Sequence, residues 1–386
     1  MNSQPHSISM VNLVRQYQRY QTEIDAAMGS VLEVGDFIQG NAVKELESDL
    51  CQHLSVKHTI TCGNGTDALQ LAFMALDLPQ GCEVIIPSFA YAALAEVVLL
   101  LGFVPVFAEV DPHTYLIDPD DIARKITEKT KAIAPVHLFG LVCNMDAILE
   151  IAQNRGLYVV EDAAQAIGAF YRGEKFQGFA GTLGTVGTTS FFPSKNLGCY
   201  GDGGAVFCSN DSLALIIRQL ANHGQSSKYI HDIVGVNSRL DTLQAVVLRV
   251  KLKHLEAFNR ARAGIADRYC AGLKELVDEG NLVLPQSNPK MENGSTKLSH
   301  VFHQFTLRLT VHEKREAFRQ FLAQAAVPTM VYYPLPLHRQ KAYFQSVGLT
   351  ITENLCNSVL SLPICPELSV EEQDYIIATI VDFFKK

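Results

Sequence analysis

Short apolar segments alternate with amphipathic ones through the first 220 residues of the chain. The apolar segments are 58–62, 83–86, 104–107, 132–136 and 156–160, and helical patterns are expected over 63–72, 92–101 and 119–128, and from Met145. Such alternation is typical of a mainly parallel sheet with helices on both faces. A last strand is expected around Val206, before a helix over 212–222. The pattern therefore predicts an α/β fold.

The pattern changes near residue 250. A long helical stretch over 251–277 leads into a polar linker over 285–297, rich in Asn, Ser and Pro. Beyond the linker we expect a smaller α/β unit, whose elements are a strand over 301–309, a helix over 313–325 and a closing helix over 370–384. We therefore expect a large domain over 1–250, with an N-terminal arm over 1–37, and a small C-terminal domain over 251–386.

Composition narrows the classes of function. The formal net charge is −8 over 386 residues and no run of Lys and Arg occurs, which argues against nucleic acid or an anionic membrane as the main partner. The most apolar stretch, 91–108, is interrupted by Glu96, Gly102 and Pro105, and the N-terminus lacks a signal-peptide core, so no membrane segment is expected. Nine scattered cysteines without metal-ligand spacing indicate reduced thiols in a cytoplasmic protein and no metal site.

One lysine stands in apolar and glycine-rich surroundings. Lys195 lies in the segment TSFFPSKNLG over 189–198, closely followed by GDGG over 201–204. An ammonium among apolar side chains has a depressed pKa and a reactive free amine, which a Schiff-base lysine needs. The alternative is that Lys195 reaches solvent from a strand end and has no chemical role.

A second signal is an acidic residue at the end of a strand. The apolar segment 156–160 runs into EDAAQ over 161–165. Ligands of open parallel sheets bind at the carboxyl ends of the strands, so Asp162 is well placed to hold a protonated pyridine nitrogen, with Gln165 near the ring hydroxyl. Alternatively, Asp162 is a helix cap or a turn former.

A third signal is a glycine turn between a strand and a helix. The segment GNGTDALQLA over 63–72 follows the apolar run 58–62. A helix N-terminus offers unpaired backbone N–H groups, so Gly65 and Thr66 can bind a phosphate without a basic side chain. The alternative is an ordinary helix capped by Thr66 or Asn64.

In content and order these three elements resemble the DegT/DnrJ/StrS family of sugar aminotransferases, which are fold type I pyridoxal-phosphate enzymes. The resemblance runs from FIQG over 37–40 to VYYPLPLH over 331–338, and EDAAQ and SFFPSKNLG are its most specific parts. It implies that Lys195 carries the internal aldimine with pyridoxal 5'-phosphate, that Asp162 binds the pyridinium and that Gln165 binds the ring hydroxyl. The phosphate would be held by Gly65, Thr66 and Ser190.

The resemblance also implies roles for aromatic and partner residues. Tyr91 matches the family's aromatic residue that stacks on the cofactor ring; the alternative is an aromatic residue at the start of a core helix. Tyr332 and Tyr333, in the segment 331–338, are expected among the substrate-binding residues. Asn237 matches an asparagine that reaches the cofactor phosphate of the neighbouring subunit, which implies a homodimer with two shared active sites.

The segment NSRLD over 237–241 bears on the substrate. Family members acting on 4-keto sugars commonly have a tyrosine after the asparagine, whereas this segment is similar to enzymes that aminate 3-keto sugars, above all the UDP-2-acetamido-2-deoxy-3-oxo-glucuronate aminotransferases. Arg239 could pair bidentately with the uronate carboxylate. Alternatively, Arg239 is a structural ion-pair residue at a helix start, and the acceptor is a dTDP- or GDP-linked 3- or 4-keto-6-deoxy sugar.

The resemblance implies ping-pong transamination from L-glutamate to a nucleotide-linked keto sugar, in polysaccharide biosynthesis such as that of lipopolysaccharide O-antigen. Two other classes stay open. A non-catalytic regulatory protein on the same fold would more plausibly have lost Lys195 or Asp162. A sugar dehydratase of the same fold would have a histidine in place of Lys195.

Overall fold

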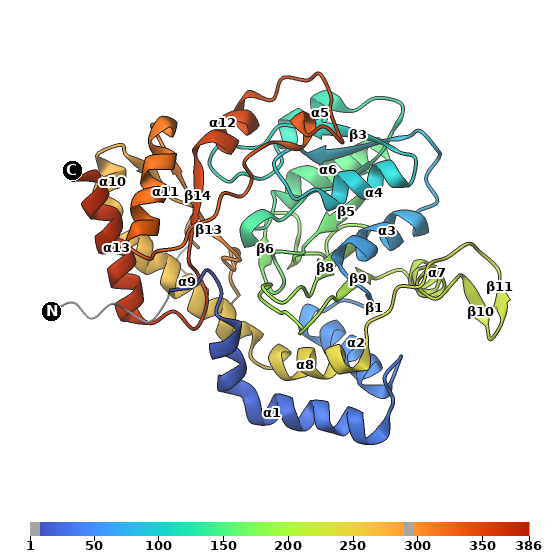
Figure 1. Cartoon of the computed structure of the whole chain (residues 1–386). Helices are drawn as coiled ribbons and strands as arrows, with labels where there is room; N and C mark the ends of the chain where they lie inside the picture. Colours follow the sequence, from blue (N-terminus) through green and yellow to red (C-terminus); the bar gives the residue numbers. More distant parts are fainter. Residues whose placement is uncertain (1–7, 289–296, 386) are drawn as a thin grey trace.

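The computed structural model describes residues 8–288 and 297–385, and its centre is a seven-stranded sheet (Figure 1). In the order of the sheet the strands are β1 (His58–Cys62), β9 (Gly204–Cys208), β8 (Val186–Ser190), β5 (Tyr158–Asp162), β4 (Thr130–Ile133), β2 (Glu83–Pro87) and β3 (Val104–Ala108). The strands from β8 to β3 are mutually parallel, whereas β9 pairs antiparallel with both β8 and β1. The sheet is therefore mixed and mainly parallel, as the sequence pattern predicts.

Helices cover this sheet, and four of the five begin after a residue whose side chain caps the first turn. They are α3 (Gly65–Ala75), α4 (Ala93–Leu100), α5 (Pro119–Lys125), α6 (Met145–Arg155) and α7 (Asp211–Ala221). Asn64, Asp118, Asn144 and Asn210 each accept a hydrogen bond from a backbone N–H group of the first turn that follows. The expected cap at Asp118 is confirmed, although α5 ends three residues earlier than the expected helix because Ile126 is extended.

The N-terminal segment contacts both parts of the chain. It forms α1 (Leu13–Val34) and α2 (Asn41–Leu54), and α1 packs along α8 (Thr242–Leu252) (Figure 1). Arg15 of α1 also pairs with Glu372 of α13 (Val370–Phe384) at 2.9 Å. The expected arm over 1–37 therefore reaches the C-terminal region as well; its first seven residues lie outside the described part of the chain.

The C-terminal region is built around a three-stranded antiparallel sheet of β12 (Leu282–Val283), β13 (Phe305–Leu309) and β14 (Val359–Leu362). Its helices are α9 (Leu255–Gly272), α10 (Lys274–Asp278), α11 (Arg315–Gln324), α12 (Thr350–Ser358) and α13. The helical stretch expected over 251–277 is helical for most of its length, but it consists of the end of α8, then α9 and α10, with breaks between α8 and α9 and at Leu273. Residues 289–296 of the expected linker lie outside the described residues, and the domain boundary near residue 250 stays a prediction.

Two short hairpins complete the described structure, together with 3-10 turns over Leu138–Gly140, His312–Lys314 and Leu337–Arg339. One hairpin pairs β6 (Phe170–Arg172) with β7 (Gln177–Phe179), and the other pairs β10 (Gln225–Ser227) with β11 (Ile230–His231). Figure 1 shows that the β10–β11 hairpin projects away from the sheet. It therefore presents side chains that the rest of the chain does not cover.

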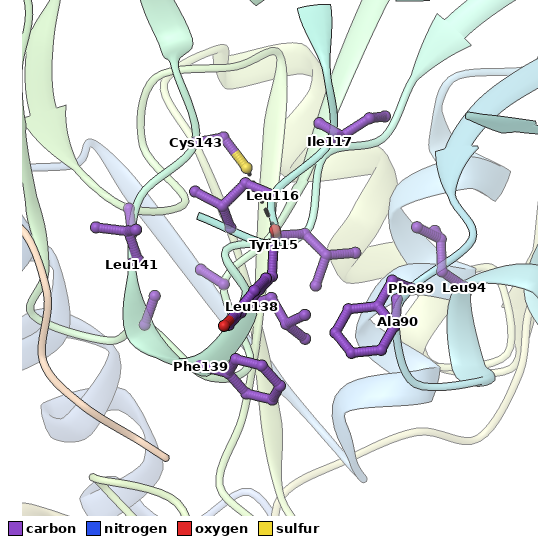
Figure 2. Packing of buried hydrophobic residues seen from close by; sticks show 14 of the residues in the cluster. Phe89, Ala90, Leu94, Tyr115, Leu116, Ile117, Leu138, Phe139, Leu141 and Cys143 are labelled. Carbon is purple, nitrogen blue, oxygen red and sulfur yellow. Dashed lines mark hydrogen bonds between the residues drawn. The ribbon is translucent and has the colours of Figure 1, made fainter. Parts of the chain in front are cut away.

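Aromatic rings pack edge to face near the carboxyl ends of the parallel strands. Phe89 lies 6.2 Å from Tyr115 and 6.3 Å from Phe139 between ring centroids, at interplanar angles of 69° and 83°. Figure 2 shows these rings together with Leu138 and Leu141. Such arrangements stabilise a core beyond the area they bury. They also give a rigid base to the loops that follow the strands.

A buried carboxylate connects β5 to the loop before β8. Glu161 is fully buried and accepts hydrogen bonds from the backbone N–H groups of Gly181, Leu183 and Gly184 at 2.9, 2.7 and 2.5 Å. The ring nitrogen Nε2 of His137 lies 2.8 Å from the same carboxylate. Because the backbone N–H of Cys143 donates to Nδ1 of His137, Nε2 carries the proton that His137 donates.

We expect Glu161→Ala to lower the free energy of unfolding by about 3 kcal/mol or more, because several buried donors lose their acceptor. Urea denaturation of the variant measures this loss. Glu150→Ala is the control: Glu150 pairs with Lys175 in solvent at 2.8 Å, so its removal should cost about 0–1 kcal/mol. Equal losses in the two variants would contradict the structural role of Glu161.

Candidate active site

A cavity of about 600 Å³ opens at the carboxyl ends of β5 and β8, beside the N-terminus of α3. Nine residues that the sequence analysis singles out line it: Gly65, Thr66, Tyr91, Asp162, Gln165, Ser190, Lys195, Tyr332 and Tyr333. They come from segments far apart in the sequence. The fold therefore gathers the lysine, the strand-end carboxylate and the helix N-terminus around one space.

Lys195 lies in the turn that follows β8. Its backbone N–H donates to the carbonyl oxygen of Phe192 at 2.8 Å, which closes the turn after Pro193. The side chain keeps partial exposure because it faces the cavity, but the surrounding protein desolvates it and lowers the pKa of Lys195 to about 8. The negative charge of Asp162 opposes this shift. About a tenth of the amine is thus unprotonated and nucleophilic at pH 7, far more than for a lysine in solvent.

Asp162 ends β5 and faces the same cavity. Desolvation raises the pKa of Asp162, while the backbone N–H of Ala164 and the charge of Lys195 lower it. Oxygen Oδ1 accepts the hydrogen bond from Ala164 at 3.0 Å, and among the described residues Oδ2 has no hydrogen-bond partner. A desolvated carboxylate with one unpaired oxygen suits a protonated ring nitrogen.

Gln165 is held in one orientation. Its Oε1 accepts from the backbone N–H of Phe139 at 2.7 Å, and its Nε2 donates to the hydroxyl of Tyr333 at 3.3 Å. Burial raises the pKa of Tyr333, so the phenol stays protonated. The Gln165 amide nitrogen thus points toward the cavity wall formed by Tyr333, where it can donate to an oxygen of a bound ring.

Tyr91 stands at the mouth of the cavity. Its side chain is 63 % exposed, and its ring centroid lies 6.4 Å from that of Tyr333. Tyr333 in turn lies 6.1 Å from Phe89 in the aromatic core. Because so much of its ring is exposed, Tyr91 does not act as a core residue at the start of α4.

The N-terminus of α3 forms a cradle beside β8. Asn64 caps the helix by accepting from the backbone N–H of Asp67 at 2.8 Å, which leaves the N–H groups of Gly65 and Thr66 without a partner in the helix. A Cβ atom on Gly65 would lie 2.7 Å from Cβ of Ser190, so glycine permits the helix to approach the end of β8. The capped helix and the phosphate cradle are therefore compatible.

Asn237 and Arg239 lie outside this cavity. Asn237 is exposed and forms a backbone bridge with Asn222, whereas Arg239 lines a second cavity of about 420 Å³. Arg239 has no hydrogen bond or ion pair with any described residue, so the alternative of a structural ion pair finds no partner among them. Ser238 lies between Asn237 and Arg239 in the sequence, and its hydroxyl donates to Asp67 of α3 at 2.6 Å.

Sequence reasoning missed a polar group next to Lys195. His303 and Gln304 line the cavity, and Nδ1 of His303 lies 3.3 Å from Oδ1 of Asn196. The expected strand over 301–309 begins only at Phe305, so these two side chains lie on irregular backbone before β13. In the sequence, these residues could have been recognised as a polar pair, His303 and Gln304, inside the otherwise apolar run 301–305.

The described residues contain no candidate metal site, no membrane-spanning helix and no disulfide. Within residues 8–288 and 297–385, no group of three or more His, Cys, Asp and Glu side chains could hold a metal ion. No helix in this part of the chain is long and apolar enough to cross a bilayer. All nine cysteines are free thiols, and Cys199, near the lysine, is buried with its Sγ 3.0 Å from the carbonyl oxygen of Phe191.

Comparison with known proteins gives close relatives over almost the whole chain. The "pleiotropic regulatory protein" of Geobacillus stearothermophilus is 43 % identical over 98 % of this chain and 99 % of its own. The UDP-2-acetamido-2-deoxy-3-oxo-D-glucuronate aminotransferase of Pseudomonas aeruginosa is 43 % identical over 97 % of this chain and 100 % of its own. The UDP-N-acetyl-3-dehydro-alpha-D-glucosamine 3-aminotransferase of Acidithiobacillus ferrooxidans is 42 % identical, with 98 % of each chain covered.

A solved structure shows the same architecture. The crystal structure of DesV from S. venezuelae, in complex with a ketimine intermediate, superposes with a TM-score of 0.91 at 36 % identity and covers 98 % of this chain and 99 % of its own. The expected fold type I architecture and pyridoxal-phosphate dependence are confirmed. The profile of the DegT/DnrJ/EryC1/StrS aminotransferase family matches residues 18–381. The chain is a member of this family and a pyridoxal-phosphate-dependent aminotransferase.

Proposed function

We propose that this aminotransferase moves the amino group of L-glutamate to a nucleotide-linked keto sugar, with a UDP-linked 3-keto uronate as the acceptor, in polysaccharide biosynthesis such as that of lipopolysaccharide O-antigen. The observation that carries the proposal is that Lys195 and Asp162 line one cavity, where desolvation lowers the pKa of the amine to about 8. The sequence NSRLD over 237–241 and the activity for which the Pseudomonas relative is named support this acceptor.

The cavity fits the phosphate of pyridoxal phosphate at one end. The free N–H groups of Gly65 and Thr66 lie at the positive end of the α3 dipole, next to the Ser190 hydroxyl, and would hold the phosphate. The tight space between Gly65 and Ser190 supports this role, because a side chain at position 65 would fill the cradle.

The remaining residues fit the ring. Asp162 would hold the ring nitrogen, Gln165 would donate to the ring hydroxyl, and Tyr91 would cover the ring face. When bound, the cofactor supplies an aldehyde and an electron sink. Lys195 would bind the aldehyde through Nζ and, once released by the amino donor, would accept and return a proton at the same atom. Tyr332 and Tyr333 close the side of the cavity where the sugar would lie.

A homodimer would complete the site. The β10–β11 hairpin and the segment after it expose apolar side chains, with Tyr229 at 81 % and Val234 at 89 % exposure. Apolar groups so gathered indicate a surface that a partner covers. In our proposal a second copy covers it, so that Asn237 reaches the neighbouring subunit's phosphate and Arg239 its substrate. Free thiols throughout the chain suit the cytoplasm, where we place the enzyme.

Two alternatives to this function are a regulatory role and an acceptor sugar without a carboxylate. The name of the Geobacillus relative suggests a regulatory role, but the presence of both Lys195 and Asp162 favours catalysis. The Acidithiobacillus relative is named for a 3-dehydro-glucosamine, which has no carboxylate, and a dTDP- or GDP-linked 6-deoxy sugar would lack it too. Arg239 separates these acceptors from a uronate.

Lys195→Ala should abolish transamination while the protein still binds cofactor, because the phosphate and ring contacts do not need the lysine. In the wild type, borohydride should fix the cofactor to the chain, and peptide mapping should find it on Lys195. A label on another lysine, such as the buried Lys251, would overturn the assignment.

Asp162→Asn should keep the shape of the site but remove the charge that holds the ring proton. We expect the rate of the glutamate half-reaction to fall by about a hundred- to a thousand-fold. Stopped-flow absorbance of the cofactor measures this rate. An unchanged rate would mean that Asp162 is only a turn residue.

Arg239→Ala should raise the Michaelis constant for a uronate acceptor by about ten- to a hundred-fold, since losing a charge-assisted pair costs about 1.5–3 kcal/mol. The glutamate half-reaction should stay nearly unchanged. Steady-state kinetics with a uronate, a matched neutral 3-keto sugar and a 4-keto sugar test this expectation. Preference for the 4-keto sugar, or an equal loss with every acceptor, would contradict the proposed substrate.

A further inference from the structure

The side-chain amides of Asn196, the residue after Lys195, and of Asn259 form a chain of hydrogen bonds. Its donor-to-acceptor direction is fixed. Nδ2 of Asn259 donates to the carbonyl oxygen of Ile167 at 3.1 Å. Nδ2 of Asn196 donates to Oδ1 of Asn259 at 2.8 Å and to the carbonyl oxygen of Val301 at 2.9 Å. Because backbone carbonyls only accept, both amide orientations are set, and Oδ1 of Asn196 is left as an acceptor.

This acceptor determines the tautomer of His303. Oδ1 of Asn196 lies 3.3 Å from Nδ1 of His303, so Nδ1 must carry the proton. Burial, together with the positive charges of Lys195 and Arg262, lowers the pKa of His303 well below its ordinary value, so the ring is neutral. Nε2 therefore carries a lone pair.

The lone pair of His303 belongs to the wall of the catalytic cavity. The side chain is only 5 % exposed and lines the cavity together with Lys195. No described residue forms a hydrogen bond with Nε2. Nε2 faces the open space of the cavity as an acceptor, and the charged amine of Lys195 is a donor in the same cavity.

We propose that His303 is a positioning residue whose Nε2 accepts a hydrogen bond from the amine of Lys195 when the released lysine side chain turns toward it, a contact that the described structure does not contain. The inference rests on the proposed role of Lys195 as the proton-transferring amine. The proton stays on Nζ of Lys195, and no bond forms or breaks at His303. A neutral acceptor holds the ammonium within the cavity and limits its pairing with Asp162, whereas a charged histidine would repel it.

His300 provides a natural contrast three residues earlier. It is also buried, but its Nδ1 accepts from the backbone N–H of Phe302 at 3.1 Å, and its ring stacks on Phe302 at 3.7 Å. It is not part of the wall around Lys195. Its hydrogen-bond polarity is thus the reverse of that of His303, and His300→Phe is a matched control for His303→Phe.

The test measures the amine of Lys195 directly, in full-length protein stripped of cofactor. Competitive acetylation followed by mass spectrometry gives the midpoint pH at which Lys195 becomes reactive. A hydrogen bond to Nε2 stabilises the ammonium, so His303→Phe should lower this midpoint by about 0.5–1 pH unit. His303→Gln, whose Oε1 can accept, should restore most of the shift, and His300→Phe should leave the midpoint unchanged.

A second measurement follows the loaded enzyme. With His303→Phe the glutamate half-reaction should slow by about ten- to a hundred-fold, and α-deuterated glutamate should show a larger isotope effect, because proton transfer by Lys195 becomes more limiting. An unmoved midpoint in His303→Phe, an equal shift in His300→Phe, or a loss confined to the Michaelis constant of the keto sugar would each overturn the proposal. Acetylation does not depend on where borohydride fixes the cofactor, so the two hypotheses fail separately.

Discussion

Lys195 and Asp162 face one cavity, where each side chain has lost much of its hydration and each stabilises the charged form of the other. Desolvating either group alone would favour its neutral form, and the opposite charge limits that effect. The arrangement depends on β5 and β8 being adjacent and parallel, since Asp162 ends the first strand and Lys195 follows the second. The order of strands in the sheet thus sets the electrostatics of the site.

Two neighbouring carboxylates of β5 have different roles, because their side chains lie on opposite faces of the strand. Successive residues of a strand point to opposite faces, so Glu161 points away from the side that Asp162 faces. Glu161 accepts hydrogen bonds from three backbone N–H groups of the loop before β8 and from His137, whereas one oxygen of Asp162 has no hydrogen-bond partner among the described residues. One carboxylate is used to fix the two strands, and its neighbour remains available for a ligand.

The C-terminal region contributes a wall that the sheet alone lacks. The segment with Tyr332 and Tyr333 is fixed through His338, whose Nδ1 lies 2.7 Å from the Ser88 hydroxyl and whose Nε2 lies 2.9 Å from Glu353. Ser88 lies three residues before Tyr91, so the same hydrogen bonds connect both aromatic sides of the cavity. Distant segments are therefore tied together before any ligand binds.

The local parts of this site could be predicted from the sequence, and the contacts between distant segments could not. Gly65 and Asp162 are recognisable because a turn or a strand end depends on neighbours within a few residues. The contact of Asn196 with His303 joins residues 107 apart, and it exists because β13 begins at Phe305 instead of at 301. The segment of Asn237 and Arg239 is held against α3, because the hydroxyl of Ser238 donates to Asp67. Because this contact joins residues 171 apart, the sequence alone does not show that Asn237 and Arg239 lie outside the cavity that contains Lys195.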